Sequence, residues 1–226
     1  MPGLDRPSTV ARSATEAARL SSAARALVAF TMLVMVACGS RSLKEGDSQR
    51  LISDHLMCQP VCEKQPFSDL ESVELRIQNG ALRVTWTMAG PIPIDTGSVV
   101  PPAEVVVWGL NMQRGGQRYG VGVSLRGTRW AANAAHTPIH PPHRPPGLRI
   151  HTVNIGVPVS PGPVVNGNAL TLDVPLSDFP GLTSGPFRWS ARTSVDAEFA
   201  DELPDNAHLE EDRFLARFPG KSGGRQ

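Results

Sequence analysis

The chain has 226 residues, with 22 Lys and Arg against 21 Asp and Glu, a formal net charge of +1, and 40% hydrophobic residues. Its 21 Gly and 21 Pro together are 42 of 226 residues, about 19%, below the range of about 25–30% typical of low-complexity chains. This composition favours one globular domain. It excludes a collagen, an acidic disordered tail, a uniformly basic nucleic-acid binder and a multi-span membrane protein.

The first 37 residues have the organisation of a secretory signal. Four arginines (Arg6, Arg12, Arg19 and Arg25) against Asp5 and Glu16 precede an uncharged, mostly apolar run at 26–37 that ends in small residues. As a helix this run reaches about 18 Å, too short for a hydrocarbon core of about 30 Å. We therefore expect 1–37 to be a signal peptide that is removed.

The end of this run, Val34-Met35-Val36-Ala37-Cys38, resembles the lipobox of bacterial lipoproteins, although that family most often has Leu where Met35 stands. The resemblance implies that a diacylglycerol is attached to Cys38, which becomes the first residue of the mature chain on the extracytoplasmic face of the cell membrane. A diacyl group supplies the two acyl chains that stable anchoring requires. The alternative is an ordinary signal peptide with a chance cysteine.

Residues 38–68 are predicted to hold the lipidated cysteine, a polar tether and a Cys-x₃-Cys segment. The stretch 39–50 is small and polar, and apolar spacing predicts a short helix over 48–57. In an exported protein, Cys58 and Cys62 favour a disulfide. With His55 and Met57 beside them, they also resemble the Cys-x₃-Cys of copper-delivery proteins, and this leaves a metal or redox site as the alternative.

Residues 69–205 are predicted to form one all-β, antiparallel β-sandwich or jelly-roll-like domain. Alternating apolar residues, hairpin signals at Asn79-Gly80 and Gly115-Gly116, and the absence of long helical patterns favour this fold over a parallel α/β fold. Trp86 and Trp108 are expected in its core. The expected strands are 72–77, 81–88, 104–112, 118–125, 149–157, 169–174 and 186–195.

Two Pro-rich stretches, 89–103 and 131–148, are predicted as loops because proline removes ladder donors. The second contains His136, His140 and His143, with His151 just beyond it. In an extended chain, His140 and His143 are about 10 Å apart. A solvated Pro/His loop is therefore expected, with zinc or copper binding by these histidines as the alternative.

The C-terminal part is acidic. Asp196, Glu198, Asp201, Glu202 and Asp205 predict a solvated acidic face, with calcium binding as the alternative. Residues 206–218 have the pattern of an amphipathic helix, followed by a tail to 226.

Charge is distributed in blocks along the mature chain. Residues 38–104 carry 6 basic and 9 acidic residues, 105–172 carry 6 arginines and no acid, and 173–226 carry 6 basic and 10 acidic residues. The arginines predict a basic face that binds an anionic ligand or docks on the acidic C-terminal helix. Beside them, Trp130 is a candidate platform for a sugar ring. The candidate arginines are Arg114, Arg118, Arg126 and Arg129, together with Arg144 and Arg149.

The stretch 164–205 has a turn, a strand ending Val174-Pro175-Leu176, then Phe187-Arg188-Trp189-Ser190-Ala191 and an acidic Asp-x-x-Pro-Asp. This order looks like the last strands of secreted bacterial β-sandwich domains related to carbohydrate-binding and DOMON-type modules. The resemblance implies a binding module over 69–205. Relatives often carry an Asp-rich turn suggestive of calcium, but the corresponding turn at 113–117 has no carboxylate.

Signatures of catalysis, such as Gly-x-Ser-x-Gly, Ser-x-x-Lys and a P-loop, are absent from the sequence. We therefore expect a non-catalytic, membrane-anchored lipoprotein without a cofactor, which binds a cell-envelope glycan, anionic lipid or anionic polymer and no nucleic acid. The alternatives are copper or redox handling through Cys58 and Cys62, and an envelope structural or assembly factor with a protein partner.

The lipid anchor leads to a direct prediction. In cells labelled with palmitate, the full chain should incorporate label, and Cys38→Ser should not, because it lacks the thiol that carries the diacylglycerol. Cys58→Ser is the control and should be labelled like the unaltered chain. Labelling of Cys38→Ser would show that the acyl group sits elsewhere.

Overall fold

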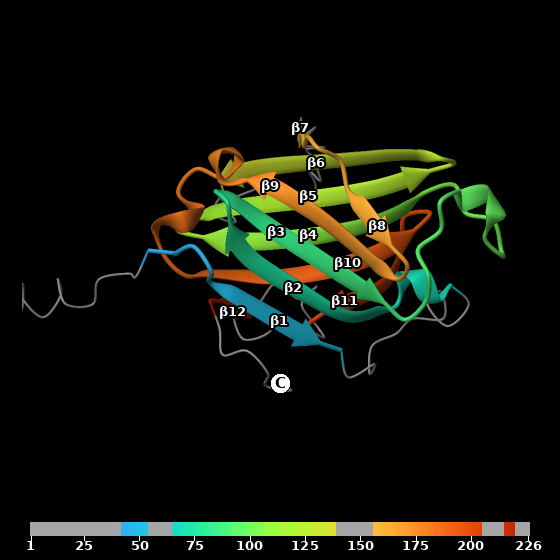
Figure 1. Cartoon of the computed structure of the whole chain (residues 1–226), viewed down its shortest axis with the longest axis horizontal. Helices are drawn as coiled ribbons and strands as arrows, with labels where there is room; N and C mark the ends of the chain where they lie inside the picture. Colours follow the sequence, from blue (N-terminus) through green and yellow to red (C-terminus); the bar gives the residue numbers. More distant parts are fainter. Residues whose placement is uncertain (1–41, 54–64, 139–155, 205–214, 220–226) are drawn as a thin grey trace, which may run out of the picture. The chain divides into compact units, whose positions relative to one another are not determined.

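The computed structural model describes residues 42–53, 65–138, 156–204 and 215–219, and all structural statements below concern these residues. They form two antiparallel β-sheets that lie one over the other (Figure 1), so the predicted all-β sandwich is confirmed. No helix in the described ranges is long and apolar enough to cross a membrane.

The smaller sheet has the strand order β1-β2-β3-β9-β8, and the larger has β11-β10-β4-β5-β6-β7, with β12 paired to β10 beside β11. The strands of the smaller sheet are β1 (Ser48–Ile52), β2 (Leu70–Gln78), β3 (Ala81–Met88), β8 (Val164–Asn166) and β9 (Ala169–Pro175). Those of the larger are β4 (Val106–Arg114), β5 (Gln117–Arg126), β6 (Arg129–Pro138), β7 (Val157–Pro158), β10 (Phe187–Val195), β11 (Glu198–Leu203) and β12 (Ala216–Phe218). Four 3₁₀ turns complete the fold: η1 (Pro66–Ser68), η2 (Thr96–Ser98), η3 (Leu176–Asp178) and η4 (Leu182–Ser184).

Two tight hairpins set the pairing of the central strands. Asn79 and Gly80 join β2 to β3 with φ of 51° and 71°, and Gly115 and Gly116 join β4 to β5 with φ of 56° and 74°. Two consecutive residues with positive φ make the type I′ turn, whose twist matches that of antiparallel strands. Both predicted hairpin signals are therefore confirmed.

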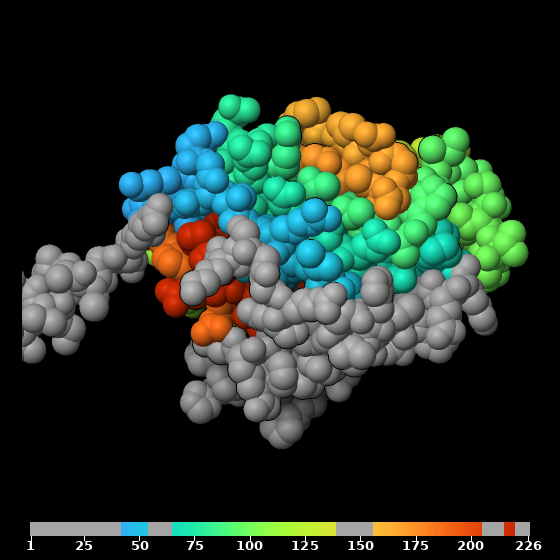
Figure 2. All heavy atoms as spheres, turned by 60° about the horizontal axis from the view of Figure 1, so that its bottom comes forward, coloured from blue at the N-terminus to red at the C-terminus, as the bar shows by residue number. Residues whose placement is uncertain are grey.

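The core lies between the sheets and is filled by alternate residues of the strands. Trp86 and Trp108 are fully buried, as predicted, and so is Trp189. The indole Nε1 of Trp189 donates to the Gln49 Oε1 at 2.9 Å, which ties β1 of the small sheet to β10 of the large one. Trp189 also pairs with Ala216 of β12. The strands β1 and β12, which come from opposite ends of the described chain, therefore lie side by side (Figures 1 and 2).

Asp201 forms a second connection between the sheets. Its Oδ2 accepts a hydrogen bond from the backbone N–H of Leu70 at 2.8 Å, where β2 begins, and its Oδ1 accepts from the N–H of Glu202 at 2.8 Å. Asp201 and Glu202 are each 2% exposed, so the predicted solvated acidic face is wrong for this pair. Asp196 is separate from them and accepts the N–H groups of Glu104 and Val105 at 2.6 and 2.8 Å.

Two predicted helices are wrong in their described parts. Residues 48–52 form β1, because Gln49 and Leu51 face the core while Ile52, 62% exposed, faces outward, a period of two. Residues 216–218 form β12, in which Phe218 stacks on Phe187 at 4.8 Å between ring centroids. In both cases pairing with a neighbouring strand outweighs the local pattern. Residues 54–57 and 206–214 of these predicted helices lie outside the described residues.

The predicted loop over 131–148 is also wrong in its described part. Residues 129–138 form β6, which pairs along its whole length with β5. Ala132 and Ala134 of β6 are buried against the core, and the first proline of the stretch, Pro138, is the last residue of the strand. The proline-dense remainder, 139–148, lies outside the described residues, as do 149–155 of the strand predicted over 149–157.

The position of Asp201 predicts a large loss of stability in Asp201→Ala. This change leaves two backbone N–H groups without their acceptor, and a buried unsatisfied group costs about 1–3 kcal/mol. We expect the free energy of unfolding to fall by about 2–4 kcal/mol in denaturant titrations. Glu71→Ala, which removes an exposed carboxylate next to Leu70 on β2, is the control and should change this free energy by less than about 0.5 kcal/mol.

Candidate ligand-binding face

The outer face of the large sheet is determined by strand alternation. Because Trp108, Leu110 and Met112 of β4 are buried in the core, the residues between them point to the other side. The register of β4 with β10 and β5, and of β5 with β6, then assigns the outward residues of all four strands. We call the outward surface of β10, β4, β5 and β6, with Arg217 of β12, the arginine face.

Arginines occupy both ends of this face, and its middle rows hold mostly small or amide side chains, together with Arg192 and Val107. One end is the cross-strand row Arg217, Arg188, Gln113, Arg118 and Thr137, and the other end is the pair Arg126 and Arg129. The rows between them are Ser190, Asn111, Gly120 and Ala135, then Arg192, Gly109, Gly122 and Asn133, then Ser194, Val107, Ser124 and Ala131. At about 3.4 Å per residue, Arg118 and Arg126 of β5 are about 27 Å apart.

The predicted arginines do not all share this face. Arg118, Arg126 and Arg129 lie on it, whereas Arg114 is at the tip of the β4–β5 hairpin and donates from Nη1 to the carbonyl of Gly181. Arg144 and Arg149 lie outside the described residues, as do 205–214, so docking of the arginines on the acidic 206–214 stretch is not described.

Three further arginines, Arg188, Arg192 and Arg217, belong to the arginine face and were missed by the sequence reasoning. They lie within residues 173–226, where acidic residues outnumber basic ones, so that the net charge of this block gave no sign of a basic surface. Only the pairing of β10 with β4 and β12 brings them beside the acid-free stretch. The alternation of Arg188 and Arg192 with apolar residues in the expected strand 186–195 indicated that both arginines point outward. The sequence did not indicate that this strand pairs with β4.

Among the described residues, two carboxylates lie beside these arginines. Glu104, at the rim, approaches Arg126 with 3.6 Å between carboxylate oxygen and guanidinium nitrogen, and both side chains are exposed. Glu202 continues the row of Arg192 on β11 but is buried. In the described part of the chain, arginines therefore outnumber carboxylates on the arginine face.

The structure places Trp130 against the core instead of on this face. Trp130 pairs with Leu125 on the inward side, and its ring stacks on that of buried Trp108, with 5.6 Å between centroids and 21° between planes. One face of the indole is thus covered by the fold. Trp130 is therefore not part of the arginine face.

The candidate metal ligands are not brought together in the described part of the chain. His136 is exposed near the end of β6, with its ring 6.4 Å from that of Tyr119. Among the residues that the structure describes, no three His, Cys, Asp or Glu side chains are grouped so that they could hold a metal ion. Cys38, Cys58, Cys62, His140 and His143 lie outside the described residues.

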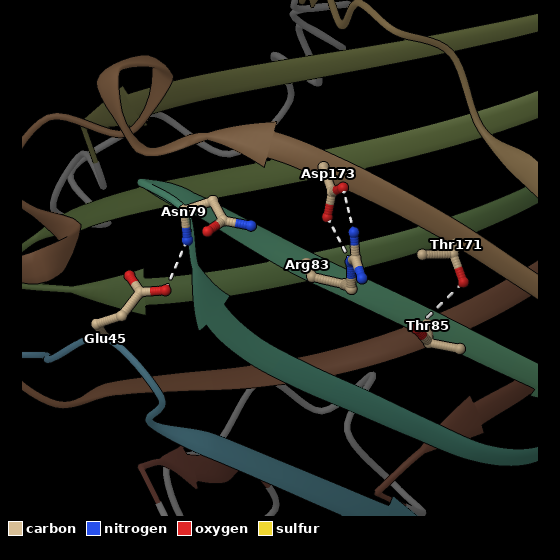
Figure 3. A network of polar contacts seen from close by, with 6 residues as sticks. All are labelled: Glu45, Asn79, Arg83, Thr85, Thr171 and Asp173. Atoms are coloured by element: carbon tan, nitrogen blue, oxygen red, sulfur yellow. Dashed lines mark hydrogen bonds and ion pairs between the residues drawn. The ribbon is translucent and has the colours of Figure 1, made fainter.

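The outer face of the small sheet is different, because its polar groups bind one another (Figure 3). Arg83 makes two hydrogen bonds to Asp173, Nε–Oδ1 at 2.7 Å and Nη2–Oδ2 at 2.6 Å, and the hydroxyls of Thr85 and Thr171 are 3.2 Å apart. The hydrogen bond from Arg83 lowers the pKa of Asp173, and the same bond raises the pKa of Arg83. On the arginine face, by contrast, no hydrogen bond joins the side chain of Asn111, Asn133 or Ser190 to another described residue.

In comparisons with known proteins, no family model, no curated protein and no solved structure matches this chain. The geometry and charge of the molecule itself are therefore what indicate its function.

The Arg83–Asp173 pair predicts a small, pH-dependent contribution to stability. Because the folded-state pKa of Asp173 is lowered, this contribution is present above the usual carboxyl pKa of about 4 and is lost as the pH falls through the lowered value. The side chains of Arg83 and Asp173 are 41% and 36% exposed, so solvent screening limits the effect of Asp173→Asn to about 1 kcal/mol or less at neutral pH.

Denaturant titrations from about pH 7 to pH 3 of the single variants Asp173→Asn and Arg83→Gln and of the double variant measure this coupling. The double variant should be no less stable than either single one, and the difference from the unaltered chain should shrink toward the acid end. A constant difference across this pH range would contradict the assignment.

Proposed function

We propose that this protein is an extracytoplasmic lipoprotein, anchored through Cys38, whose β-sandwich binds an anionic polymer of the cell envelope on the arginine face without catalysing a reaction. The observation that carries the proposal is the difference between the two outer faces. Six arginines lie on the outward surface of the large sheet, whereas Arg50, Arg76 and Arg83 on the small sheet are interspersed with Glu74 and Asp173.

Guanidinium groups support an anionic ligand on chemical grounds. Each presents a planar fork of N–H donors that matches a carboxylate or phosphate, and it stays charged at every physiological pH. The arginines stand at both ends of a face about 27 Å long, so that a compact ion reaches one end only. An extended chain with repeated negative charges reaches both.

A polymer fits this face better than a bilayer surface does. Proteins that dock on bilayers bury apolar side chains between the lipid headgroups. The large apolar side chains exposed in the described part of the chain are Ile52, Ile94, Val100, Val157 and Val164, and none of them is an outward residue of β10, β4, β5 or β6. Small side chains in the middle of the face allow a flat chain to approach the strands.

Binding should depend on arginines of this face and not on basic residues elsewhere. Hydrogen bonds to charged groups contribute about 1.5–3 kcal/mol each, so the double variant Arg129→Gln/Arg192→Gln should lower affinity for polygalacturonate at least about tenfold. Both side chains are exposed, so this variant should keep its stability. Calorimetric titration of the full chain, repeated at higher salt, measures the change.

Arg76→Gln, which removes an exposed arginine from the small sheet, is the matched control and should bind like the unaltered chain. A phosphorylated mannan distinguishes phosphate from carboxylate preference, and an uncharged glucan should not bind. Binding to vesicles with anionic lipid but to neither charged polymer would replace the proposal with a membrane-surface function. An equal loss in Arg76→Gln would show that only net charge matters.

A further inference from the structure

Three glycines lie together in the middle of the arginine face, inside strands. Gly109 of β4 pairs with Gly122 of β5, and Gly120 lies in the neighbouring row, opposite Asn111. Glycine weakens a strand interior, and a glycine there often marks a place where a ligand or another backbone approaches closely. We call Gly109, Gly120 and Gly122 the glycine lane.

Packing within the described fold does not require these glycines. A Cβ atom built on Gly122 meets no atom within 4 Å, and one built on Gly120 meets only the carbonyl oxygen of Leu110, at 4.0 Å. On Gly109 the nearest atom is the Cγ of Arg192 at 3.5 Å, an ordinary van der Waals contact. None of the three has a positive φ. The missing side chains therefore leave open space over Gly120 and Gly122, whereas the Arg192 side chain lies over Gly109.

Polar groups border the lane on both sides. Asn111 stands on β4 and Asn133 on β6, and the Arg192 side chain passes over Gly109 from β10. Ser190, in the row of Asn111, is only 8% exposed, yet its hydroxyl makes no hydrogen bond within the described residues. The hydroxyl oxygen itself is accessible, so it can donate to or accept from a ligand.

These groups match an acidic sugar. Carboxamide and hydroxyl side chains can donate to and accept from sugar hydroxyls, and Arg192 offers its fork to a carboxylate or phosphate. Arg192 on β10 and Asn133 on β6, on either side of Gly109 and Gly122, are three strand spacings apart, about 14 Å, which leaves room for a sugar ring between them.

We propose that the glycine lane is the contact site for an acidic sugar residue of the polymer, with Arg192 on its anionic group and Asn111, Asn133 and Ser190 on its hydroxyls. This inference rests on the proposed function and identifies the unit that is bound. The lane, and not the arginines alone, then determines which anionic polymers bind.

The test fills the lane without removing a charge. Gly122→Val places a β-branched side chain in open space, so the midpoint of unfolding should stay the same or rise, while affinity for polygalacturonate should fall at least about tenfold. Ala81→Val adds similar bulk on the outer face of the small sheet and should bind normally. Asn111→Leu, of similar size, should also lower affinity and provides a second test if Gly122→Val proves unstable.

Methyl-esterified polygalacturonate, which has the same rings without the charge, separates the two contributions. The unaltered chain should bind the esterified form more weakly than the charged form. Gly122→Val should lower the affinity for both forms, whereas Arg192→Gln should lower the affinity for the charged form only. If the unaltered chain binds polygalacturonate and Gly122→Val and Asn111→Leu bind it equally well, the glycine lane is not the contact site and the proposed function stands. If the unaltered chain binds no charged polymer, the proposed function itself fails, and the lane with it.

Discussion

The two-residue alternation of side chains in a strict antiparallel register is the constraint on which the rest of this molecule depends. Type I′ turns at Asn79-Gly80 and Gly115-Gly116 set that register, since a slip of one residue would turn every core side chain toward solvent. Once Trp108 and its neighbours on β4 face inward, Gly109, Asn111 and Gln113 must face outward. The composition of the outer face is thus a consequence of how the core is filled.

The same alternation yields two outer faces of opposite character. On the small sheet, Arg83 and Asp173 and also Thr85 and Thr171 are complementary cross-strand partners that hydrogen-bond each other, although Arg76 stands opposite Arg83. On the large sheet, Arg188 stands opposite Arg217, and Arg126 opposite Arg129. Guanidinium groups gathered on one surface attract an anionic ligand. This is the physical basis of the proposed function.

Much of the fold follows from local sequence signals, and the failures share one cause. Strands with clear alternation and a turn signal, such as β2, β3, β5 and β9, were predicted because each signal is contained within about ten residues. The strands β1, β6 and β12 were missed because their local patterns are ambiguous, and pairing with β2, β5 and β10 decides them. Asp201 was misplaced for the same reason, since its role as acceptor for Leu70 joins residues 131 positions apart.

The sequence by itself determined the all-β class, the hairpin positions and the acid-free stretch of arginines, because each of these is a property of composition or of neighbouring residues. Only the tertiary structure decided which arginines share a surface. Arg114 contacts the carbonyl of Gly181 and is not part of the arginine face. Arg188, Arg192 and Arg217, from the acidic C-terminal block, lie on that face. Trp130 stacks on Trp108. The tertiary structure also placed Gly109 beside Gly122. Strand order and register join residues that are distant in the chain, and no local pattern encodes that pairing.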